Sequence, residues 1–408
     1  MLRWQLPEYV SDAMPDEARR IEDLRRQLLD HYRSYGYELV APPLLEHLDA
    51  LLTGSGSRLA MRTFQLVDQV SGRTLGVRAD MTPQAARIDA HLLNRQGVTR
   101  LCYAGPVLHT LPVSLLATRE PIQVGTELFG HAGLEADLET LELMVGSISL
   151  AQVPAIRIDL AHAAIVPAIL KQLPADQAAV LDLDQLYDLL VQKDQEGLLE
   201  LLAGCSAEVC RGITSLCELY GPVSAQDLSV LRLARERLPN EPTISEALDA
   251  IEALVCSQLW ASMPTLTLAI DLADLQGYHY YSGISFTAFA LPGEDGQLHS
   301  EALARGGRYD GVGAAFGRSR PAVGFTLELR TLAALGLTHE NSGPARGILA
   351  PWLDDPQLRE SIAQLRASGE IVLQVLPGHE QEQAEFDCDR ELVFKSDRWE
   401  IQALAAKK

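Results

Sequence analysis

The sequence predicts an α+β fold built on a largely antiparallel sheet, and three observations lead to this prediction. Strand-like segments occupy both halves of the chain, but they do not alternate with helices in the regular order of a parallel doubly wound sheet. Residues 162–262 interrupt them and are poor in strand signals, so they are predicted to form a mostly helical insertion. The segment Gly306-Gly-Arg-Tyr-Asp-Gly311 lacks the Gly-x-Gly-x-x-Gly spacing of a dinucleotide-binding loop.

Composition limits the classes of protein to be considered. The chain has 408 residues, 47% of them hydrophobic, which is enough for two or three structural units. Its net charge of −21 repels phosphate backbones, and no cluster of Lys and Arg offsets it, so nucleic-acid binding is not expected. The six cysteines show no zinc-ligand spacing, so no metal site is expected. Without a signal core or a long apolar run, the chain is predicted to be cytoplasmic and not to span a membrane.

The N-terminal part begins with a predicted amphipathic helix at residues 15–35. Pro15 suits the first helical turn, Asp16 favours the positive end of the helix dipole, and Gly36 can end the helix. The elements predicted next, in chain order, are a strand at 37–45, a hairpin at 62–80, a helix at 82–95, strands at 99–105 and 121–129, a helix at 135–151 and a strand at 155–160.

Strands return after the helical insertion, and a separate unit follows them. The elements predicted there are a strand at 265–271, a hairpin at 278–290, a strand at 321–329, a β-α-β pattern at 347–375 and a closing hairpin at 391–403. The chain is therefore predicted to contain a large domain at 1–335 and a small C-terminal α/β unit at 340–408.

Polar residues near the first strands form two candidate ligand-binding clusters. Asp80 and Thr82 lie between a strand and a helix, where a plain helix-capping role is the alternative. Gln123 and Glu127 are four residues apart, so on a strand both side chains point to the same face. Two polar groups on an otherwise apolar strand indicate a ligand surface, although an exposed strand face would explain them equally well.

Two further clusters come late in the chain. The first is Tyr278-His-Tyr-Tyr281-Ser-Gly283, and the second is Arg305-Gly-Gly-Arg-Tyr309-Asp-Gly311. Cross-strand aromatic pairs and a glycine turn are the purely structural interpretation of these segments. Each cluster alone is a weak signal, but four in this order are hard to explain by chance.

In this order the four clusters resemble the histidine-recognition segments of class II histidyl-tRNA synthetases. Arg78-Ala-Asp80-Met-Thr82-Pro-Gln84 is closer still to a family of synthetase-like proteins, the regulatory subunits of ATP phosphoribosyltransferase. The resemblance implies a class II synthetase-like fold and a histidine-binding site. The residues that it implies for this site are Asp80, Thr82, Gln123, Glu127, Tyr281 and Tyr309. We expect Asp80, Gln123 and Glu127 to hold the ammonium group of histidine, and Tyr281 and Tyr309 to line its ring.

The chain departs from the synthetases where those enzymes carry nucleotide-binding arginines. By resemblance, these positions hold His109, Gln276 and Thr331. Adenylate formation needs preorganised cations at the developing phosphate charge, and the loss of one such donor typically costs about 10²–10³ in rate. A histidine side chain with an ordinary pKa of ~6.5 does not replace a fixed arginine charge. No catalytic residue and no aminoacylation activity are therefore expected.

The resemblance implies a non-catalytic regulatory role in the first step of histidine biosynthesis. The chain would activate a short-form catalytic subunit and transmit feedback inhibition when free histidine fills the site, without a cofactor. It would form dimers within a hetero-octamer. Two alternatives remain: a synthetase-like amino-acid-sensing module with another partner, and an active histidyl-tRNA synthetase.

Overall fold

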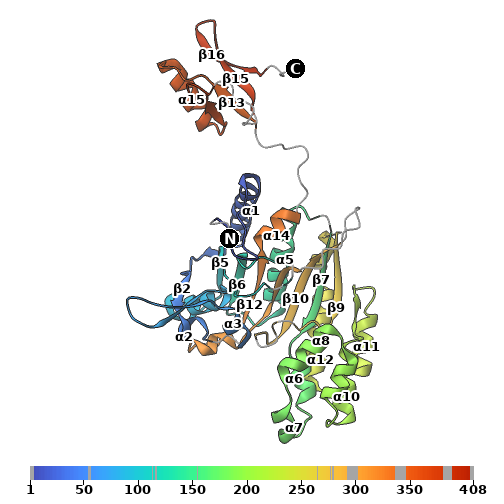
Figure 1. The fold of residues 1–408 in the computed structure, drawn as a ribbon. Coiled ribbons are helices and arrows are strands. Elements are labelled where there is room, and N and C mark those ends of the chain that lie inside the picture. The colour runs from blue at the N-terminus through green and yellow to red at the C-terminus, as the bar shows by residue number, and fades with distance from the viewer. Residues whose placement is uncertain are drawn as a thin grey trace. The chain divides into compact units, whose positions relative to one another are not determined.

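The computed structural model divides the chain into two compact units, Met1–Leu337 and Thr338–Lys408. The structure describes the following residues: 4–53, 57–112, 114, 117–153, 155–263, 265–275, 277, 280–291, 302–335, 346–379 and 388–404. The larger unit carries all the predicted histidine-site residues, so its sheet is the part of the fold that matters most for the site (Figure 1).

A nine-stranded sheet forms the centre of the larger unit, with strand order β1-β5-β6-β12-β11-β10-β7-β9-β8. Its strands are β1 (Glu38–Leu39), β5 (Thr99–Pro106), β6 (Ile122–Phe129), β7 (Ile156–His162), β8 (Tyr220–Pro222), β9 (Leu266–Asp271), β10 (Ile284–Ala290), β11 (Ala302–Arg308) and β12 (Ala322–Glu328). Only the pairs β1–β5 and β7–β9 are parallel among these strands. The predicted α+β class with a largely antiparallel sheet is confirmed.

One face of this sheet is covered by helices and forms the main core. The helices are α1 (Pro15–Ser34), α5 (Leu134–Leu150) and α12 (Pro242–Val255), and Figure 1 shows α1 and α5 with the short α14 (Leu329–Leu335) beside the sheet. Tyr32 of α1 meets Phe325 of β12 edge to face, with ring centroids 6.1 Å apart. Because these side chains fill one face, the polar residues at alternate strand positions are left on the other.

The predicted helix at 15–35 illustrates why local signals suffice for an amphipathic element. Helix α1 spans Pro15–Ser34, with the proline and two acidic residues in its first turn. Its buried residues are Ile21, Leu24, Leu28 and Tyr32, which recur at helical spacing. Gly36 follows with a φ of +83°, a conformation that glycine adopts without the cost that a Cβ imposes.

The predicted hairpin at 62–80 forms β3 (Gln65–Val67) and β4 (Thr74–Val77), which pair antiparallel beside β2 (Leu45–His47). Between β2 and β3 lie the short helices α2 (Leu48–Leu51) and α3 (Ser57–Arg62). The predicted helix at 82–95 is α4 (Thr82–Arg87), which continues as one π-helical turn, Ile88–Leu93.

The predicted hairpin at 278–290 is wrong. Residues 284–290 form the single strand β10, which pairs with β7 on one side and β11 on the other. Tyr280 and Tyr281 precede this strand and pack their rings at a centroid distance of 6.0 Å instead of pairing across a hairpin. Aromatic enrichment is typical of strands, but here the two rings pack against each other before the strand begins.

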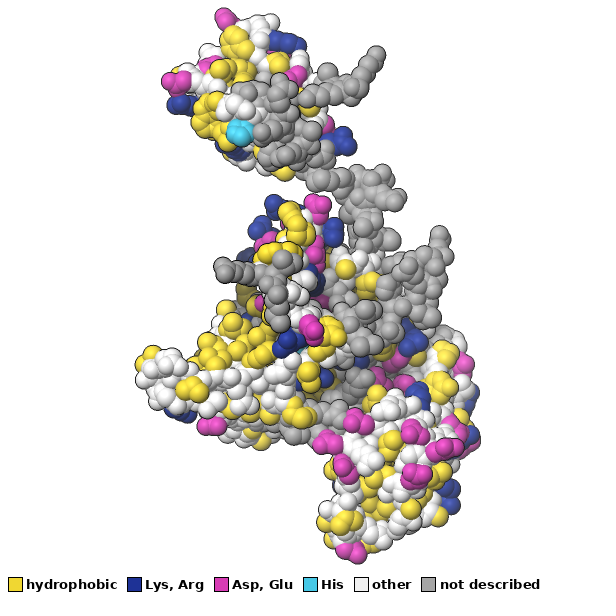
Figure 2. Space-filling model, viewed as in Figure 1, with side chains coloured by type: hydrophobic (Ala, Val, Ile, Leu, Met, Phe, Trp, Pro, Cys, Tyr) yellow, Lys and Arg dark blue, Asp and Glu magenta, His cyan; other side chains and the backbone are white. Residues whose placement is uncertain are grey.

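The segment between β7 and β9 is rich in helices. It contains α6 (Ile165–Leu170), α7 (Ala175–Val180), α8 (Leu183–Gln192), α9 (Gln195–Leu201), α10 (Ala207–Leu216), α11 (Ser229–Arg237), α12 and a 3-10 turn, Gln258–Ser262. Lys193 at the end of α8 links this segment to the sheet, because its Nζ lies 2.8 Å from Asp271 Oδ2. Figure 2 shows acidic side chains spread over this region, in keeping with the net charge of −21.

The smaller unit has a four-stranded sheet of order β14-β13-β15-β16. The bounds are β13 (Gly347–Ala350), α15 (Pro356–Ala367), β14 (Val372–Gln374), β15 (Cys388–Lys395) and β16 (Arg398–Ala403). The β13-α15-β14 unit is parallel, and β15 and β16 form an antiparallel hairpin. Within the described part of the chain, no helix is long and apolar enough to cross a membrane.

Candidate functional site

The predicted site residues gather on the sheet face opposite the helices, and strand register arranges them in rows. In the first, the Glu127 row, the residues in register are Glu127, Gly324, Gly307 and Ser285. In the next, the Arg305 row, they are Gly125, Thr326, Arg305 and Thr287. The third, the Gln123 row, pairs Gln123 with Glu328. Because the rows are two residues apart along each strand, all three point to the same face.

Glu127 is the most deeply buried carboxyl group of the site, with 1% of its surface exposed. Tyr103 donates a hydrogen bond to its Oε1 at 2.8 Å, and the Tyr309 hydroxyl donates to its Oε2. Thr82 extends this network through its hydroxyl, 3.0 Å from that of Tyr103. Burial raises the pKa of Glu127 to about 8, although the hydrogen bonds from the two tyrosines oppose the shift. Burial therefore favours the protonated form of Glu127 in the ligand-free chain.

Two glycines make room for this network. A Cβ on Gly324 would lie 1.8 Å from Glu127 Oε2 and 2.4 Å from a backbone oxygen. Gly125 of β6 lies directly opposite Tyr103 of β5. A Cβ on Gly125 would lie 2.7 Å from the Tyr103 hydroxyl. Both positions therefore require glycine, because a side chain would displace the carboxyl group or the tyrosine that binds it.

Asp80 and Gln123 hold the loop in front of α4. The backbone N–H of Thr82 donates to Asp80 Oδ1 at 3.2 Å, and the N–H of Met81 donates to Gln123 Oε1 at 3.1 Å. Asp80 thus makes a local turn contact at the start of α4, but it does not cap the helix, because Met81 occupies the N-cap position and no side chain caps it. Burial is the main cause of the raised pKa of Tyr281, and the negative charge of Asp80 adds to it. Asp80 therefore lies close to the site. Structural and ligand-binding roles are therefore compatible for this residue.

The aromatic residues form one wall of the site. The rings of Tyr280 and Tyr309 lie 4.8 Å apart, and Tyr309 also meets Phe129 edge to face. The Tyr281 ring covers Gly307, since its Cδ1 is 2.9 Å from the position that a Cβ on Gly307 would take. A flat ligand placed over the Glu127 row would therefore meet aromatic rings and a carboxyl group together.

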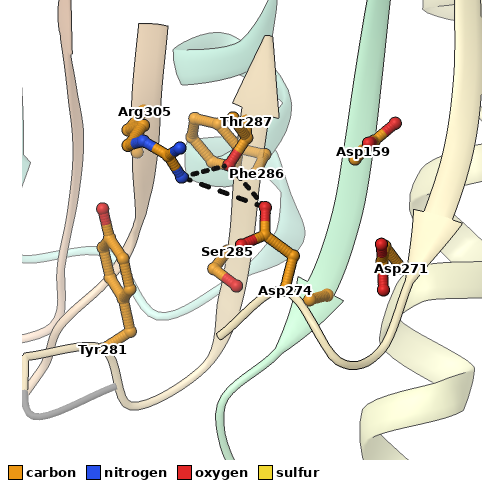
Figure 3. A pocket seen from close by; sticks show the side chains of 10 residues that line it. Asp159, Asp271, Asp274, Tyr281, Ser285, Phe286, Thr287 and Arg305 are labelled. Atoms are coloured by element: carbon orange, nitrogen blue, oxygen red, sulfur yellow. Dashed lines mark hydrogen bonds and ion pairs between the residues drawn. The ribbon is translucent and has the colours of Figure 1, made fainter. Parts of the chain in front are cut away.

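A small polar cavity of about 10 Å³ adjoins Tyr281 on the same face. It is lined among others by Asp159, Asp274, Ser285, Thr287 and Arg305. Figure 3 shows the Arg305 guanidinium pointing toward Thr287 and Asp274, with Tyr281 beside it. In the described part of the chain, no group of three His, Cys, Asp or Glu side chains is placed to hold a metal ion.

At two of the predicted nucleotide-binding positions, the residue forms a hydrogen bond within the fold. His109 is buried, and its Nε2 lies 3.0 Å from the carbonyl oxygen of Ala79. Burial lowers the pKa of His109, which makes the ring neutral at physiological pH. The backbone N–H of Thr331 donates to Glu328 Oε2 at 2.5 Å at the start of α14. Gln276 lies outside the described residues.

Sequence reasoning missed two residues of this face. Tyr103 binds Glu127, but in the sequence it is one aromatic residue in an ordinary strand, and only its position opposite Gly125 marks it. Glu328 lies beside Gln123 and accepts a hydrogen bond from the backbone N–H of Ile122 at 3.0 Å. Its place in the face follows from the β6–β12 pairing, which joins residues about two hundred positions apart.

Comparisons with known proteins identify the family. A family model for histidyl-tRNA synthetase matches residues 9–332, and one for the C-terminal domain of the ATP phosphoribosyltransferase subunit HisZ matches residues 345–402. An ATP phosphoribosyltransferase regulatory subunit from Burkholderia multivorans is 53% identical, over 98% of this chain and 100% of that protein. One from Bordetella pertussis is 51% identical, over 99% of this chain and 100% of that protein. The chain belongs to the family of ATP phosphoribosyltransferase regulatory subunits.

Solved structures share its fold. An ATP phosphoribosyltransferase regulatory subunit/histidyl-tRNA synthetase from Bacillus halodurans has a TM-score of 0.77 at 23% identity, covering 95% of this chain and 98% of that one. Histidyl-tRNA synthetase from Nostoc has a TM-score of 0.76 at 18% identity, covering 99% and 95%. The predicted class II synthetase-like fold is confirmed. The sequence relatives confirm a regulatory subunit rather than an active synthetase, while the roles of the individual site residues stay predictions.

Proposed function

We propose that this regulatory subunit binds free histidine over the Glu127 row and controls a short-form ATP phosphoribosyltransferase catalytic subunit. The chain would activate that subunit when the site is empty and inhibit it when histidine is bound. A ligand changes an equilibrium only by its differential affinity for two states, so histidine must bind the inhibited state of the complex more tightly. The proposed assembly contains dimers of this chain within a hetero-octamer.

The single observation that carries this proposal is the buried carboxyl group of Glu127 between tyrosine hydroxyls. A neutral imidazole has one N–H donor and a flat apolar face. It fits a carboxyl group that is bound by Tyr309 and has the Tyr281 ring over Gly307 of the same row. Asp80 and Gln123 are proposed to hold the ammonium group, and Thr82 supports them. In place of the ammonium contact expected from the sequence, we assign Glu127 to the imidazole, because burial favours its uncharged form.

The nucleotide side of the face supports regulation rather than catalysis. His109 is neutral and hydrogen-bonded within the fold, and Glu328 adds a carboxyl group beside Gln123. Neither residue supplies the cation that adenylate formation needs. We therefore propose that histidine binding is read out by a partner subunit and not by reaction with ATP.

The test measures the rate of the cognate catalytic subunit, alone and with this chain, across a histidine titration. The expected result is a rise in rate on adding the chain and a loss of that rise as histidine saturates the complex. Unchanged rates, together with no co-elution of the two proteins, would contradict the proposed partnership. An active complex that ignores histidine would contradict only the sensing role.

A further inference from the structure

The residues proposed to bind histidine leave its α-carboxylate without a cation. Asp80, Gln123 and Glu127 are acidic or neutral, and Thr82, Tyr281 and Tyr309 are neutral hydroxyl residues. A carboxylate that leaves water needs charged or strongly polar donors to offset its desolvation. Some basic residue on this face should therefore complete the site.

Arg305 is placed to do so. It stands on β11 in register with Thr326 of β12, which is itself in register with Gly125 of β6. It is two residues before Gly307 of the Glu127 row, so its side chain leaves the sheet on the ligand face. Burial raises the pKa of Tyr281, and the positive charge of Arg305 opposes this shift. The guanidinium therefore lies near the Tyr281 hydroxyl.

Two other arginines near the site are already engaged elsewhere. Arg78 donates to the carbonyl oxygens of Pro42 and Pro106 at 2.7 and 2.9 Å. Arg308 is on the opposite face, where it pairs with Asp137 of α5 at 2.9 Å. Neither can turn to the ligand without breaking buried contacts.

Arg305 is held much more loosely. Among the described residues it donates one hydrogen bond, to Thr287 Oγ1 at 3.2 Å, and its ion pair with Asp274 has a separation of 3.9 Å (Figure 3). Its side chain is 35% exposed. A guanidinium has five N–H donors in a planar fork that matches a carboxylate, so most of this capacity is available to a ligand.

We propose that Arg305 binds the α-carboxylate of the amino-acid effector. This inference rests on the proposed histidine site and adds its missing cation. The ligand Cα lies over Thr326, the ammonium group points toward Gln123 and Asp80, and the imidazole extends over the Glu127 row. The carboxylate points along the Arg305 row toward β11.

Three carboxylates line the cavity beside Arg305, and each keeps another contact when Arg305 turns to the ligand. Two of the carboxylates that line the adjoining cavity already have partners: Asp159 pairs with Arg157 at 2.8 Å, and Asp271 with Lys193 at 2.8 Å. Asp274 accepts a hydrogen bond from Thr287 at 3.4 Å, so it retains a donor when Arg305 turns to the ligand. The Ser285 hydroxyl, buried and without a hydrogen-bond partner among the described residues, is a second donor beside this position.

The experiment compares L-histidine with L-histidinol, in which a hydroxymethyl group replaces the carboxylate. Binding of each ligand to the full-length chain is measured by calorimetry for the wild type, Arg305→Met and Arg305→Lys. We expect Arg305→Met to weaken histidine binding about 10- to 100-fold while histidinol binding changes less than about 3-fold. Arg305→Lys keeps the charge but not the fork, so it should recover part of the affinity for histidine.

Arg235→Met is the matched control, because Arg235 pairs with Asp249 and Glu252 away from the site. Thermal unfolding of each variant separates misfolding from loss of a contact, and Arg305→Lys serves if Arg305→Met does not fold. Equal weakening of both ligands, or no weakening of histidine, would overturn the role of Arg305 alone. Wild-type protein that binds neither ligand would overturn the histidine site itself, and this inference with it.

Discussion

The two ends of one sheet face differ in the side chains that they present. At the Glu127 row, a buried carboxyl group is bound by Tyr103 and Tyr309, and glycines opposite it keep the face open. At the Gln123 row, Glu328 stands beside Gln123, and nearby His109 is neutral and bonded to the backbone. The Glu127 row presents a buried polar cluster, whereas Gln123, Glu328 and His109 add no positive charge to the other end.

This difference bears on the proposal that the chain senses histidine without acting as a synthetase. The proposed histidine site uses groups of β6, of β11 and of the segments beside the sheet, while phosphate chemistry needs cations. The proposal requires that the first set can work without the second. Four predictions test this separation, from the largest expected effect to the smallest.

The largest effect is expected from Glu127→Ala. The substitution removes the carboxyl group and leaves the buried hydroxyls of Tyr103 and Tyr309 without their acceptor. We expect histidine affinity to fall by more than about 100-fold and feedback inhibition to disappear, while activation of the catalytic subunit persists. Glu135→Ala, at a carboxylate with 80% of its side chain exposed, is the control for calorimetry and rate assays. A Glu127→Ala protein with wild-type histidine affinity would remove Glu127 from the site.

The second prediction concerns pH and stability. The pKa of Glu127 is about 8 in the folded chain, above its ordinary value of 4.5, so folding favours its protonated form. Its contribution to stability is complete below pH 4.5 and is lost as pH rises through 8. Relative to Glu127→Gln, which does not titrate, the wild type should lose roughly 2–5 kcal/mol of unfolding free energy over this range. Urea unfolding of both proteins at pH 5, 7 and 9 measures the difference, and a pH-independent difference would contradict the buried, protonated state.

The third prediction concerns the space that Gly324 provides. In Gly324→Ala the new methyl group would overlap Glu127 Oε2 and the backbone oxygen of Thr126. We expect a loss of about 1–3 kcal/mol in stability, as in overpacked cores, together with weaker histidine binding. Gly204→Ala is the control, since a Cβ there meets nothing within 4 Å. Comparable results for the two variants in denaturant unfolding and calorimetry would mean that Gly324 is not needed for the site.

The smallest effect is expected at the nucleotide end. His109→Gln keeps a neutral side chain that can reach the Ala79 carbonyl oxygen, so histidine affinity should change less than about 2-fold. Histidine-dependent exchange of pyrophosphate into ATP should be undetectable for the wild type and the variant alike. A large loss of histidine affinity in calorimetry would show that the two ends of the face are coupled.

Local pattern was sufficient for many elements of the fold. Helix α1 and strands β5, β6 and β12 lie where the predicted segments are, because their apolar residues repeat with the period of the element. The error at 278–290 has a physical reason: Tyr280 and Tyr281 resemble strand residues in composition, but their rings pack against each other, and the Tyr281 ring lies over Gly307. Composition alone does not distinguish these two uses of an aromatic ring.

The sequence by itself determined the family, the acidic charge and the short clusters around Asp80, Gln123, Glu127 and Tyr309. Only the tertiary structure decided that Tyr103 binds Glu127, that Gly324 clears its carboxyl group, and that Arg305 shares their face. These relations depend on the register of strands far apart in the chain. A slip of one residue would turn each side chain to the other face, and no local segment encodes that choice.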